Sequence, residues 1–275
     1  MIENHDQYFE ANKDIWNQRT GIHKDSTFYD VAGFKNGAIS LTSIELNEVG
    51  DVKGKKLLHL QCHFGLDTMS WSRLGAKCTG IDLSNEAIKL AKEINDEIRL
   101  NAEFICCNLY DLHPQYLNPP MKGCEEAFDI VFTSYGTVGW LPDLTKWAEV
   151  IAYYLKPGGL FYIADFHPVI WMFDDDFTRI QYYYDNRELI VTENYGTYTD
   201  RKADIKGKEY SWNHSISEIL NALIKEGLEI QQFNEFNYSP YANFANSVEV
   251  DQGKWQIKGM EGKLPVVYSI KAIKK

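Results

Sequence analysis

Residues 57–68 read LLHLQCHFGLDT, and the two halves of this stretch differ in character. The beginning is apolar apart from His59, as is typical of a buried strand in a parallel sheet. A turn through His63 to Gly65 follows, and the residues after it suit a helix that ends at Gly75. The stretch therefore predicts a strand, a loop and a helix in direct succession.

The same succession continues through most of the chain. Ser84 and Ser215 are suited to cap helices, and Pro157 with the glycines after it is typical of a helix end. We therefore expect an α/β fold with a doubly wound, mostly parallel seven-stranded sheet, helices on both faces, an antiparallel last strand and an inserted cap. Short apolar runs place the strands at 57–60, 77–81, 103–107, 128–133, 160–164, 228–233 and 266–273.

The formal net charge of −11 bears on the kind of partner. Nucleic acids are bound largely through Lys and Arg, so no nucleic acid is expected and a small molecule is favoured. No apolar run reaches the length that crosses a membrane, so no membrane partner is expected either. The oligomeric state stays open between a monomer and a homodimer.

The five cysteines bear on the compartment and on metal binding. Their number is odd and no Cys-x-x-Cys pair occurs, so reduced thiols and a cytoplasmic location are expected. His59, Cys62 and His63 are metal-ligand types. A strand would point His59 and Cys62 to opposite faces, and no fourth ligand is evident, so no metal site is expected.

Ligands of a doubly wound sheet bind beyond the carboxyl ends of its strands. The loop at 61–65 leads into a helix N-terminus, which can hold a carboxylate or a phosphate. Asp82 ends the second strand, where a carboxylate accepts hydrogen bonds from the hydroxyls of a ribose. Alternatively, Asp82 is only an acidic residue at the start of the next helix. Together the loop and Asp82 predict a cofactor that contains adenosine.

Five blocks of the sequence are similar to motifs of one family. They are 57–68, 79–84, 104–112, 128–136 and 155–159, and they keep the order and spacing of those motifs. The chain thus resembles class I, Rossmann-like S-adenosylmethionine-dependent methyltransferases, and in particular a subgroup of uncharacterised bacterial ones. It departs from the usual first motif, because His59 stands where the family has Asp, and Gln61 and His63 stand where it has glycine.

The resemblance implies S-adenosylmethionine as the cofactor and assigns residues to its parts. Asp82 should hold the ribose, Leu83 should pack on the adenine, and Asn108 should meet the adenine edge. Asn108 is alternatively a turn residue after the third strand. The full predicted cofactor set is Trp16, Arg19, Gln61, Cys62, His63, Gly65, Asp67, Thr68, Asp82, Leu83, Asn108, Leu109, Ser134 and Tyr135.

Two other functions share part of this pattern. An NAD-dependent oxidoreductase also has a ribose-binding acid after a strand, but it needs glycines so that the backbone can approach a pyrophosphate. Gln61 and His63 would obstruct that approach, whereas S-adenosylmethionine carries no phosphate. The second alternative is a module that binds S-adenosylmethionine without catalysis.

In-line methyl transfer from a sulfonium depends mainly on alignment and desolvation. The resemblance places Ser134 and Tyr135 near the sulfonium. A base would help with a hydroxyl or thiol acceptor, and His167 is the first candidate, with His214 and Tyr135 behind it. His167 is alternatively a structural residue of the turn before Pro168.

Four segments are expected along the chain. Residues 1–50 form an N-terminal helical segment that covers the site, and 51–165 form the cofactor-binding Rossmann-like core. Residues 166–212 form an inserted aromatic cap whose tyrosines and tryptophans either line the pocket or only pack the insert. A hairpin is expected in the cap, with its turn at Glu193-Asn194. Residues 213–275 complete the core sheet.

Overall fold

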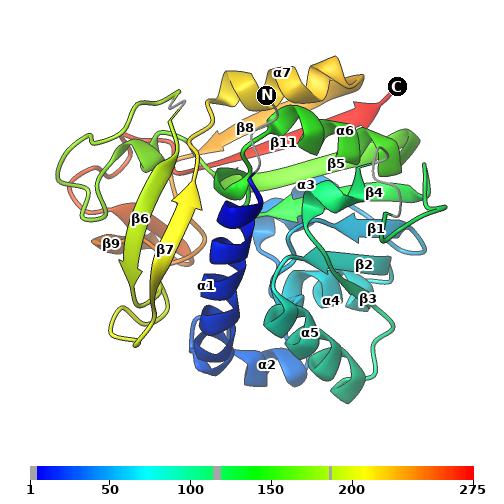
Figure 1. Cartoon of the computed structure of the whole chain (residues 1–275), viewed down its shortest axis with the longest axis horizontal. Coiled ribbons are helices and arrows are strands. Elements are labelled where there is room, and N and C mark those ends of the chain that lie inside the picture. Colours follow the sequence, from blue (N-terminus) through cyan, green and yellow to red (C-terminus); the bar gives the residue numbers. More distant parts are fainter. Residues whose placement is uncertain (1–4, 114–118, 186–187) are drawn as a thin grey trace.

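A seven-stranded sheet forms the centre of the computed structural model, which describes residues 5–113, 119–185 and 188–275 (Figure 1). The strand order is β3-β2-β1-β4-β5-β11-β8. Only β11 runs antiparallel to its neighbours, β5 and β8. The predicted sheet is therefore confirmed. Its strands are β1 (Lys56–His59), β2 (Lys77–Asp82), β3 (Glu103–Cys106), β4 (Phe128–Ser134), β5 (Leu155–Phe166), β8 (Leu228–Phe236) and β11 (Val267–Lys274).

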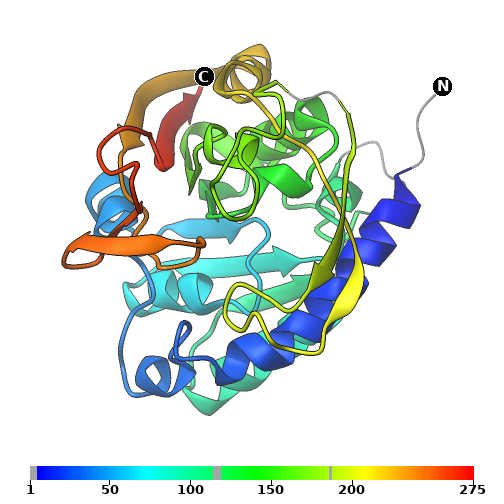
Figure 2. The same ribbon diagram turned by 90° about the vertical axis from the view of Figure 1, so that its left-hand side faces the viewer.

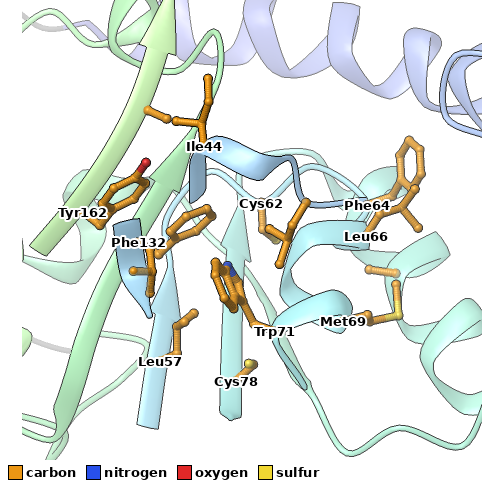
Figure 3. Close-up of a cluster of buried hydrophobic side chains, with 14 of the residues drawn as sticks. Ile44, Leu57, Cys62, Phe64, Leu66, Met69, Trp71, Cys78, Phe132 and Tyr162 are labelled. Carbon is orange, nitrogen blue, oxygen red and sulfur yellow. The ribbon is translucent and has the colours of Figure 1, made fainter. Parts of the chain in front are cut away.

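Helices cover both faces of the sheet because successive strand residues point to opposite sides. Leu57 belongs to the buried cluster that contains Trp71, whereas Leu58 belongs to the cluster that contains Trp147. Figure 3 shows the first cluster, in which the rings of Trp71 and Phe132 lie 5.5 Å apart. Helices α3 (Ser43–Val49), α4 (Leu66–Arg73) and α5 (Asn85–Glu97) contribute to the first cluster, and α6 (Leu144–Tyr154) and α7 (Ile216–Lys225) to the second.

Local sequence explains where the helices next to the site begin. The Ser84 hydroxyl accepts a hydrogen bond from Ala87 N at 3.0 Å and caps α5. Gly65 precedes α4 with a φ of 75°, a left-handed conformation that suits glycine. A Cβ at Gly65 would also lie 2.4 Å from the ring of Phe104. Glycine is therefore required at this position by both its backbone and its surroundings.

Helix α1 (Asp6–Asp25) lies between the central sheet and a separate two-stranded sheet (Figures 1 and 2). That sheet consists of β6 (Ile190–Tyr195) and β7 (Lys206–Ser211). Figure 2 shows α1 in blue running alongside this pair, and α1 and β7 are in contact along their length. Helix α2 (Val31–Lys35) follows α1.

A hairpin is present in the cap, but the predicted position of its turn was wrong. Glu193 lies inside β6 opposite Lys208 of β7, and the connection between the strands runs through 196–205. The run Ile190-Val191-Thr192 favours continued strand because β-branched residues fit an extended chain. Gly196, with a φ of 78°, follows β6 directly.

A second insertion lies between β8 and β11. It contains a two-stranded sheet of β9 (Ser247–Asp251) and β10 (Lys254–Ile257), with Gly253 in the left-handed region between them. This hairpin was not predicted, although a glycine between two runs of alternating apolar residues is a signal for one.

The remaining elements are the short helices η1 (Leu109–Leu112), η2 (Val138–Trp140) and η3 (Ile170–Met172). Across the described ranges, no helix combines the length and the apolar character that crossing a membrane requires.

Candidate functional site

A cavity of about 1100 Å³ lies at the carboxyl ends of the parallel strands, where α1 and both insertions also reach it. Thr68 and His167 do not line this cavity, although both were predicted site residues. The predicted residues that do line it are Trp16, Arg19, Gln61, Cys62, His63, Gly65, Asp67, Asp82, Leu83, Asn108, Leu109, Ser134 and Tyr135. The fold thus brings together residues from α1 and from four successive strand ends.

Asp82 joins the end of β2 to the loop that follows β1. Its Oδ2 accepts a hydrogen bond from His63 N at 2.8 Å, and its Oδ1 accepts one from Ser84 N at 2.8 Å. Burial raises the pKa of Asp82 to about 6, although these backbone hydrogen bonds act in the opposite direction. Asp82 therefore fixes the loop and also lies at the start of α5, as its alternative interpretation held.

The loop between β1 and α4 has side chains where glycine is usual in the resembling family. Gln61 and His63 adopt left-handed φ angles of 55° and 52°. Gln61 Nε2 donates to Thr137 O at 3.0 Å. Gln61 Oε1 and His63 Nδ1 are buried and have no hydrogen-bond partner among the described residues. Buried polar atoms are usually satisfied, so these two atoms indicate a site that a polar ligand completes.

Asp67 links three segments at the start of α4. Its Oδ1 accepts a hydrogen bond from the Ser40 hydroxyl at 2.5 Å, and its Oδ2 accepts one from the Ser134 hydroxyl at 3.0 Å. Burial raises the pKa of Asp67, and these two hydrogen bonds oppose that effect. The neighbouring Thr68 is fully buried and its Oγ1 lies 2.8 Å from His59 Nδ1. Thr68 therefore positions His59 and does not itself line the cavity.

Asn108 follows β3 and caps η1. Its side-chain oxygen accepts a hydrogen bond from Tyr110 N at 3.1 Å. Asn108 is thus a turn residue after the third strand, as the alternative interpretation predicted. Asn108 also lines the cavity. The side-chain nitrogen is not used in the cap, so the turn role is compatible with a contact to a ligand.

Asp165 organises the loop after β4 and was missed by the sequence analysis. From the end of β5, its carboxylate accepts hydrogen bonds from the backbone N–H groups of Gly136, Thr137 and Val138. Further hydrogen bonds come from the Thr137 hydroxyl and from Phe166 N. Asp165 ends a strand just as Asp82 does, so its position was a signal for it.

Tyr135 begins the loop that Asp165 holds. It has a φ of 33°, and its hydroxyl lies 3.4 Å from Thr42 Oγ1. Burial raises the pKa of Tyr135 well above its ordinary value, and the charge of Glu45 adds to this effect. At neutral pH its phenol is therefore a hydrogen-bond donor rather than a base.

The two histidines predicted as bases are engaged in structural contacts. His167 Nδ1 accepts a hydrogen bond from Val169 N at 3.2 Å, and Nε2 lies 2.9 Å from Glu235 Oε1. His167 thus occupies a turn, as its alternative interpretation held. His214 lines the cavity, but its Nε2 lies 2.7 Å from Leu141 O and its Nδ1 lies 3.0 Å from Glu218 Oε2. Neither geometry favours proton abstraction from an acceptor.

Helix α1 reaches the loop after β1 through its aromatic and basic residues. Trp16 packs edge-on against His63, with ring centroids 5.3 Å apart, and Arg19 lies 5.1 Å from the centre of the Trp16 ring. Arg19 is ion-paired with Glu209 of β7. Trp16 and Arg19 therefore line the cavity while tying α1 to the inserted sheet.

A chain of hydrogen-bonding side chains that the sequence did not reveal lies beside these residues. His23 Nδ1 is 2.9 Å from His63 Nε2, and His23 Nε2 is 2.6 Å from Thr197 Oγ1. Burial lowers the pKa of His23 to about 3 and places that of His63 well below its ordinary value. Both imidazoles are therefore neutral, and they connect α1, the loop after β1 and the inserted segment.

The aromatic residues of the insertions are divided between lining and surface positions. Trp171, Phe173 and Phe177 line the cavity together with Tyr241 and Phe244 of the second insertion. By contrast, Tyr183 and Tyr195 are 79% and 71% exposed, although Tyr195 also reaches the cavity edge.

Metal-ligand types do not gather at one point in the part of the chain that the structure covers. Within those ranges, no group of three or more His, Cys, Asp or Glu residues could hold a metal ion. All five cysteines are free thiols.

Comparisons with known proteins find similarity to methyltransferases. Residues 58–161 match the model of a family described as a methyltransferase domain. The chain is 28% identical over 140 residues to a ubiquinone biosynthesis O-methyltransferase of Xanthomonas oryzae, which covers 50% of this chain and 55% of that relative. The chain thus spans about half the length of the curated relatives it matches.

Solved structures show the same fold at low identity. A methyltransferase from Methanosarcina mazei, described as dependent on S-adenosylmethionine, matches with a TM-score of 0.57 and 18% identity, covering 86% of this chain and 99% of its own. A geranyl diphosphate C-methyltransferase from Streptomyces coelicolor, solved with Mg²⁺, geranyl diphosphate and S-adenosylhomocysteine, matches with a TM-score of 0.56 and 14% identity, covering 84% and 77%.

Proposed function

Because this chain carries a class I S-adenosylmethionine-dependent methyltransferase domain, we propose that it methylates a small-molecule acceptor. The observation that carries the proposal is the single cavity into which Asp82, Asn108 and the Asp67–Ser134 pair all open, with aromatic side chains of the insertions beyond them. Enclosed cavities with a few convergent polar groups are typical sites for small molecules.

S-adenosylmethionine supplies a methyl group on a positively charged sulfur when it is bound. In our proposal, Asp82 holds the ribose, and Leu83 with Asn108 holds the adenine. Gln61 Oε1 and His63 Nδ1 have free hydrogen-bonding capacity beside the loop, which suits the polar end of the methionine part. Asp67 adds a carboxylate to this part of the cavity, and a carboxylate favours a cationic ligand.

The residues of the loop argue against a dinucleotide. A pyrophosphate needs close approach of several backbone N–H groups, which glycines permit. Here the side chains of Gln61 and His63 line the cavity at this point, and Gln61 is anchored to Thr137 O. An NAD-dependent oxidoreductase is therefore the weaker candidate.

Alignment and exclusion of water are what the chain's own residues contribute to the reaction. Asp165 holds the loop from Tyr135 to Val138 rigid through its hydrogen bonds, and this loop borders the cavity. Tyr135 can donate a hydrogen bond to one lone pair of an acceptor oxygen and so orient the other lone pair toward the methyl group. The roles of these residues remain proposals, as does the division of the chain at 50, 165 and 212.

Isothermal titration tests the proposal most directly. We expect S-adenosylmethionine and S-adenosylhomocysteine to bind with one site per chain and NAD⁺ not to bind. Asp82→Ala should weaken binding, whereas Asp96→Ala on the exposed side of α5 should not. If neither adenosyl compound binds, the proposal is wrong.

Methyl transfer needs a second measurement, because a module that binds S-adenosylmethionine without catalysis would give the same titration result. Incubation with S-adenosylmethionine and a panel of small amines, phenols and thiols, read by mass spectrometry, should yield a product that is heavier by one methylene unit.

The cytoplasmic location, the exclusion of nucleic acid as a partner and a monomeric or homodimeric state remain predictions.

A further inference from the structure

One end of the cavity is walled by aromatic rings from both insertions. We call it the aromatic chamber, and it is defined by Phe166, Trp171, Phe173, Phe177, Tyr241 and Phe244, all of which line the cavity. Phe244 is central to it: its ring lies 4.9 Å from that of Phe166, 5.8 Å from that of Trp171 and 5.8 Å from that of Phe177.

The chamber exists only because the two insertions meet. Asn246 Nδ2 donates to Asp176 O at 2.9 Å and joins the segment before β9 to the segment after η3. Figure 1 shows both insertions on the same side of the central sheet. Tyr241 packs edge-on against Tyr135, with ring centroids 5.1 Å apart, so the chamber begins next to the loop after β4.

Charge at the chamber is strongly biased toward acids. Asp174, Asp175 and Asp176 line the cavity directly before Phe177. Asp174 accepts a hydrogen bond from Thr178 N and lies 3.8 Å from Nε of Arg179, whereas Asp175 and Asp176 are exposed.

Cations are scarce along the whole cavity. No lysine is among its described lining residues, and the two arginines are Arg19, which is paired with Glu209, and Arg201. Arg179 is paired with Asp174, so an anionic ligand would meet the carboxylates of Asp175 and Asp176 at the chamber.

We propose that the aromatic chamber binds a methyl acceptor that carries a positive charge, with its planar or apolar part against the rings and its ammonium group toward Asp175 and Asp176. Cations are attracted to the faces of aromatic rings, and nearby carboxylates add to that attraction. A carboxylated or phosphorylated acceptor is correspondingly disfavoured. This inference rests on the proposed function, since it names the class of its acceptor.

Three probes that share one aromatic ring and carry a cationic, a neutral or an anionic substituent test the inference. Dopamine is cationic, 4-methylcatechol is neutral and 3,4-dihydroxyphenylacetate is anionic, and all share one catechol ring. Each is titrated by calorimetry at low ionic strength, with and without S-adenosylhomocysteine. Dopamine should bind about tenfold more tightly than 3,4-dihydroxyphenylacetate, with 4-methylcatechol between them.

Matched variants locate the source of this preference. The double variant Asp175→Asn/Asp176→Asn should reduce the ratio to about twofold, because it leaves the rings and removes the two carboxylates. Glu193→Gln/Asp204→Asn removes two charges from the same insertion outside the cavity lining and should leave the ratio unchanged.

The outcomes separate the two proposals. Equal or reversed affinities of the charged probes overturn the inference, as does an unchanged ratio in Asp175→Asn/Asp176→Asn. Binding of none of the probes to a protein that binds S-adenosylhomocysteine overturns it as well. Absence of S-adenosylhomocysteine binding instead overturns the proposed function.

Discussion

At the scale of single residues, carboxylates at strand and helix ends organise the site. Asp82, Asp67 and Asp165 each accept hydrogen bonds from a different segment, and all three line the cavity. A carboxylate is suited to this because its two oxygens accept several hydrogen bonds at once. Asp165 is buried and Asp67 and Asp82 are partly buried, which makes their ionisation sensitive to pH and to a bound cation.

Cofactor affinity should depend on pH through Asp82. Its pKa of about 6 means that the carboxylate becomes protonated as the pH falls below 6, and a protonated acid accepts hydrogen bonds poorly. Affinity for S-adenosylhomocysteine should therefore be highest above this value and fall by up to about tenfold per pH unit below it.

The variant Asp82→Asn should bind about ten- to hundredfold more weakly near neutral pH and should lack this pH dependence. Titration calorimetry across the range measures both effects, with Asp96→Asn as the control. A wild-type affinity that is flat through pH 6 would contradict the prediction.

Stability should depend on pH through Glu45. Burial and the charge of Asp67 raise the pKa of Glu45 from 4.5 to about 7, and its Oε1 has no hydrogen-bond partner among the described residues. Because the folded-state pKa is the higher one, the stabilising contribution of the protonated acid is complete below about 4.5 and is lost as the pH rises through 7.

Glu45→Gln should remove this dependence. The free energy of unfolding of the wild type should fall by roughly 2–3 kcal/mol from Glu45 alone as the pH passes through this range. Urea unfolding of wild type, Glu45→Gln and the exposed control Glu93→Gln at both ends of the range measures it. Parallel pH profiles for wild type and Glu45→Gln would show the attribution to be wrong.

At the scale of elements, α1 is held to the insertion more firmly than its polar sequence suggests. Asn12 exchanges two hydrogen bonds with the backbone of Tyr210 in β7, at 2.8 and 2.9 Å. Asn17 Oδ1 also accepts a hydrogen bond from the Ser84 hydroxyl at 2.7 Å, which ties α1 to the N-terminus of α5. Helix α1 thus links α5 to β7.

Asn12→Ala should loosen α1 and weaken cofactor binding together. Loss of the paired hydrogen bonds leaves two backbone groups of Tyr210 unsatisfied, at a cost of about 1–3 kcal/mol. Hydrogen–deuterium exchange should increase in residues 6–25 and 206–211 but not in the central sheet. Gln18→Ala on the same helix is the control, because the Gln18 side chain donates its hydrogen bond to Asp14 O within α1. Unchanged exchange in α1 would contradict this role of Asn12.

At the scale of the whole molecule, the cavity is a shared product of segments that are distant in sequence. Its walls come from α1, the strand ends and both insertions, and the His63–His23–Thr197 chain joins three of these parts. A ligand that fills such a cavity stabilises all of its walls at once, since it binds only the folded chain.

Saturating cofactor should therefore raise the unfolding temperature. S-adenosylhomocysteine at about one hundred times its dissociation constant contributes about 2.7 kcal/mol, which corresponds to roughly 4–8 °C for a chain of this size. Differential scanning calorimetry should show this shift with S-adenosylhomocysteine and none with NAD⁺ at the same concentration. A shift with NAD⁺ alone would favour the oxidoreductase.

The sheet could be predicted from the sequence, because strand and helix periodicity are local properties that each element carries in its own residues. The sequence also placed Asp82, Asn108 and Ser134 at strand ends, and parallel topology then brings such residues to one edge. Roles that depend on contact partners became visible in the three-dimensional structure. His167 proved to be held by Glu235, His23 proved to meet His63, and the aromatic chamber arose where two insertions touch. No local pattern encodes these contacts, since each joins residues that are far apart along the chain.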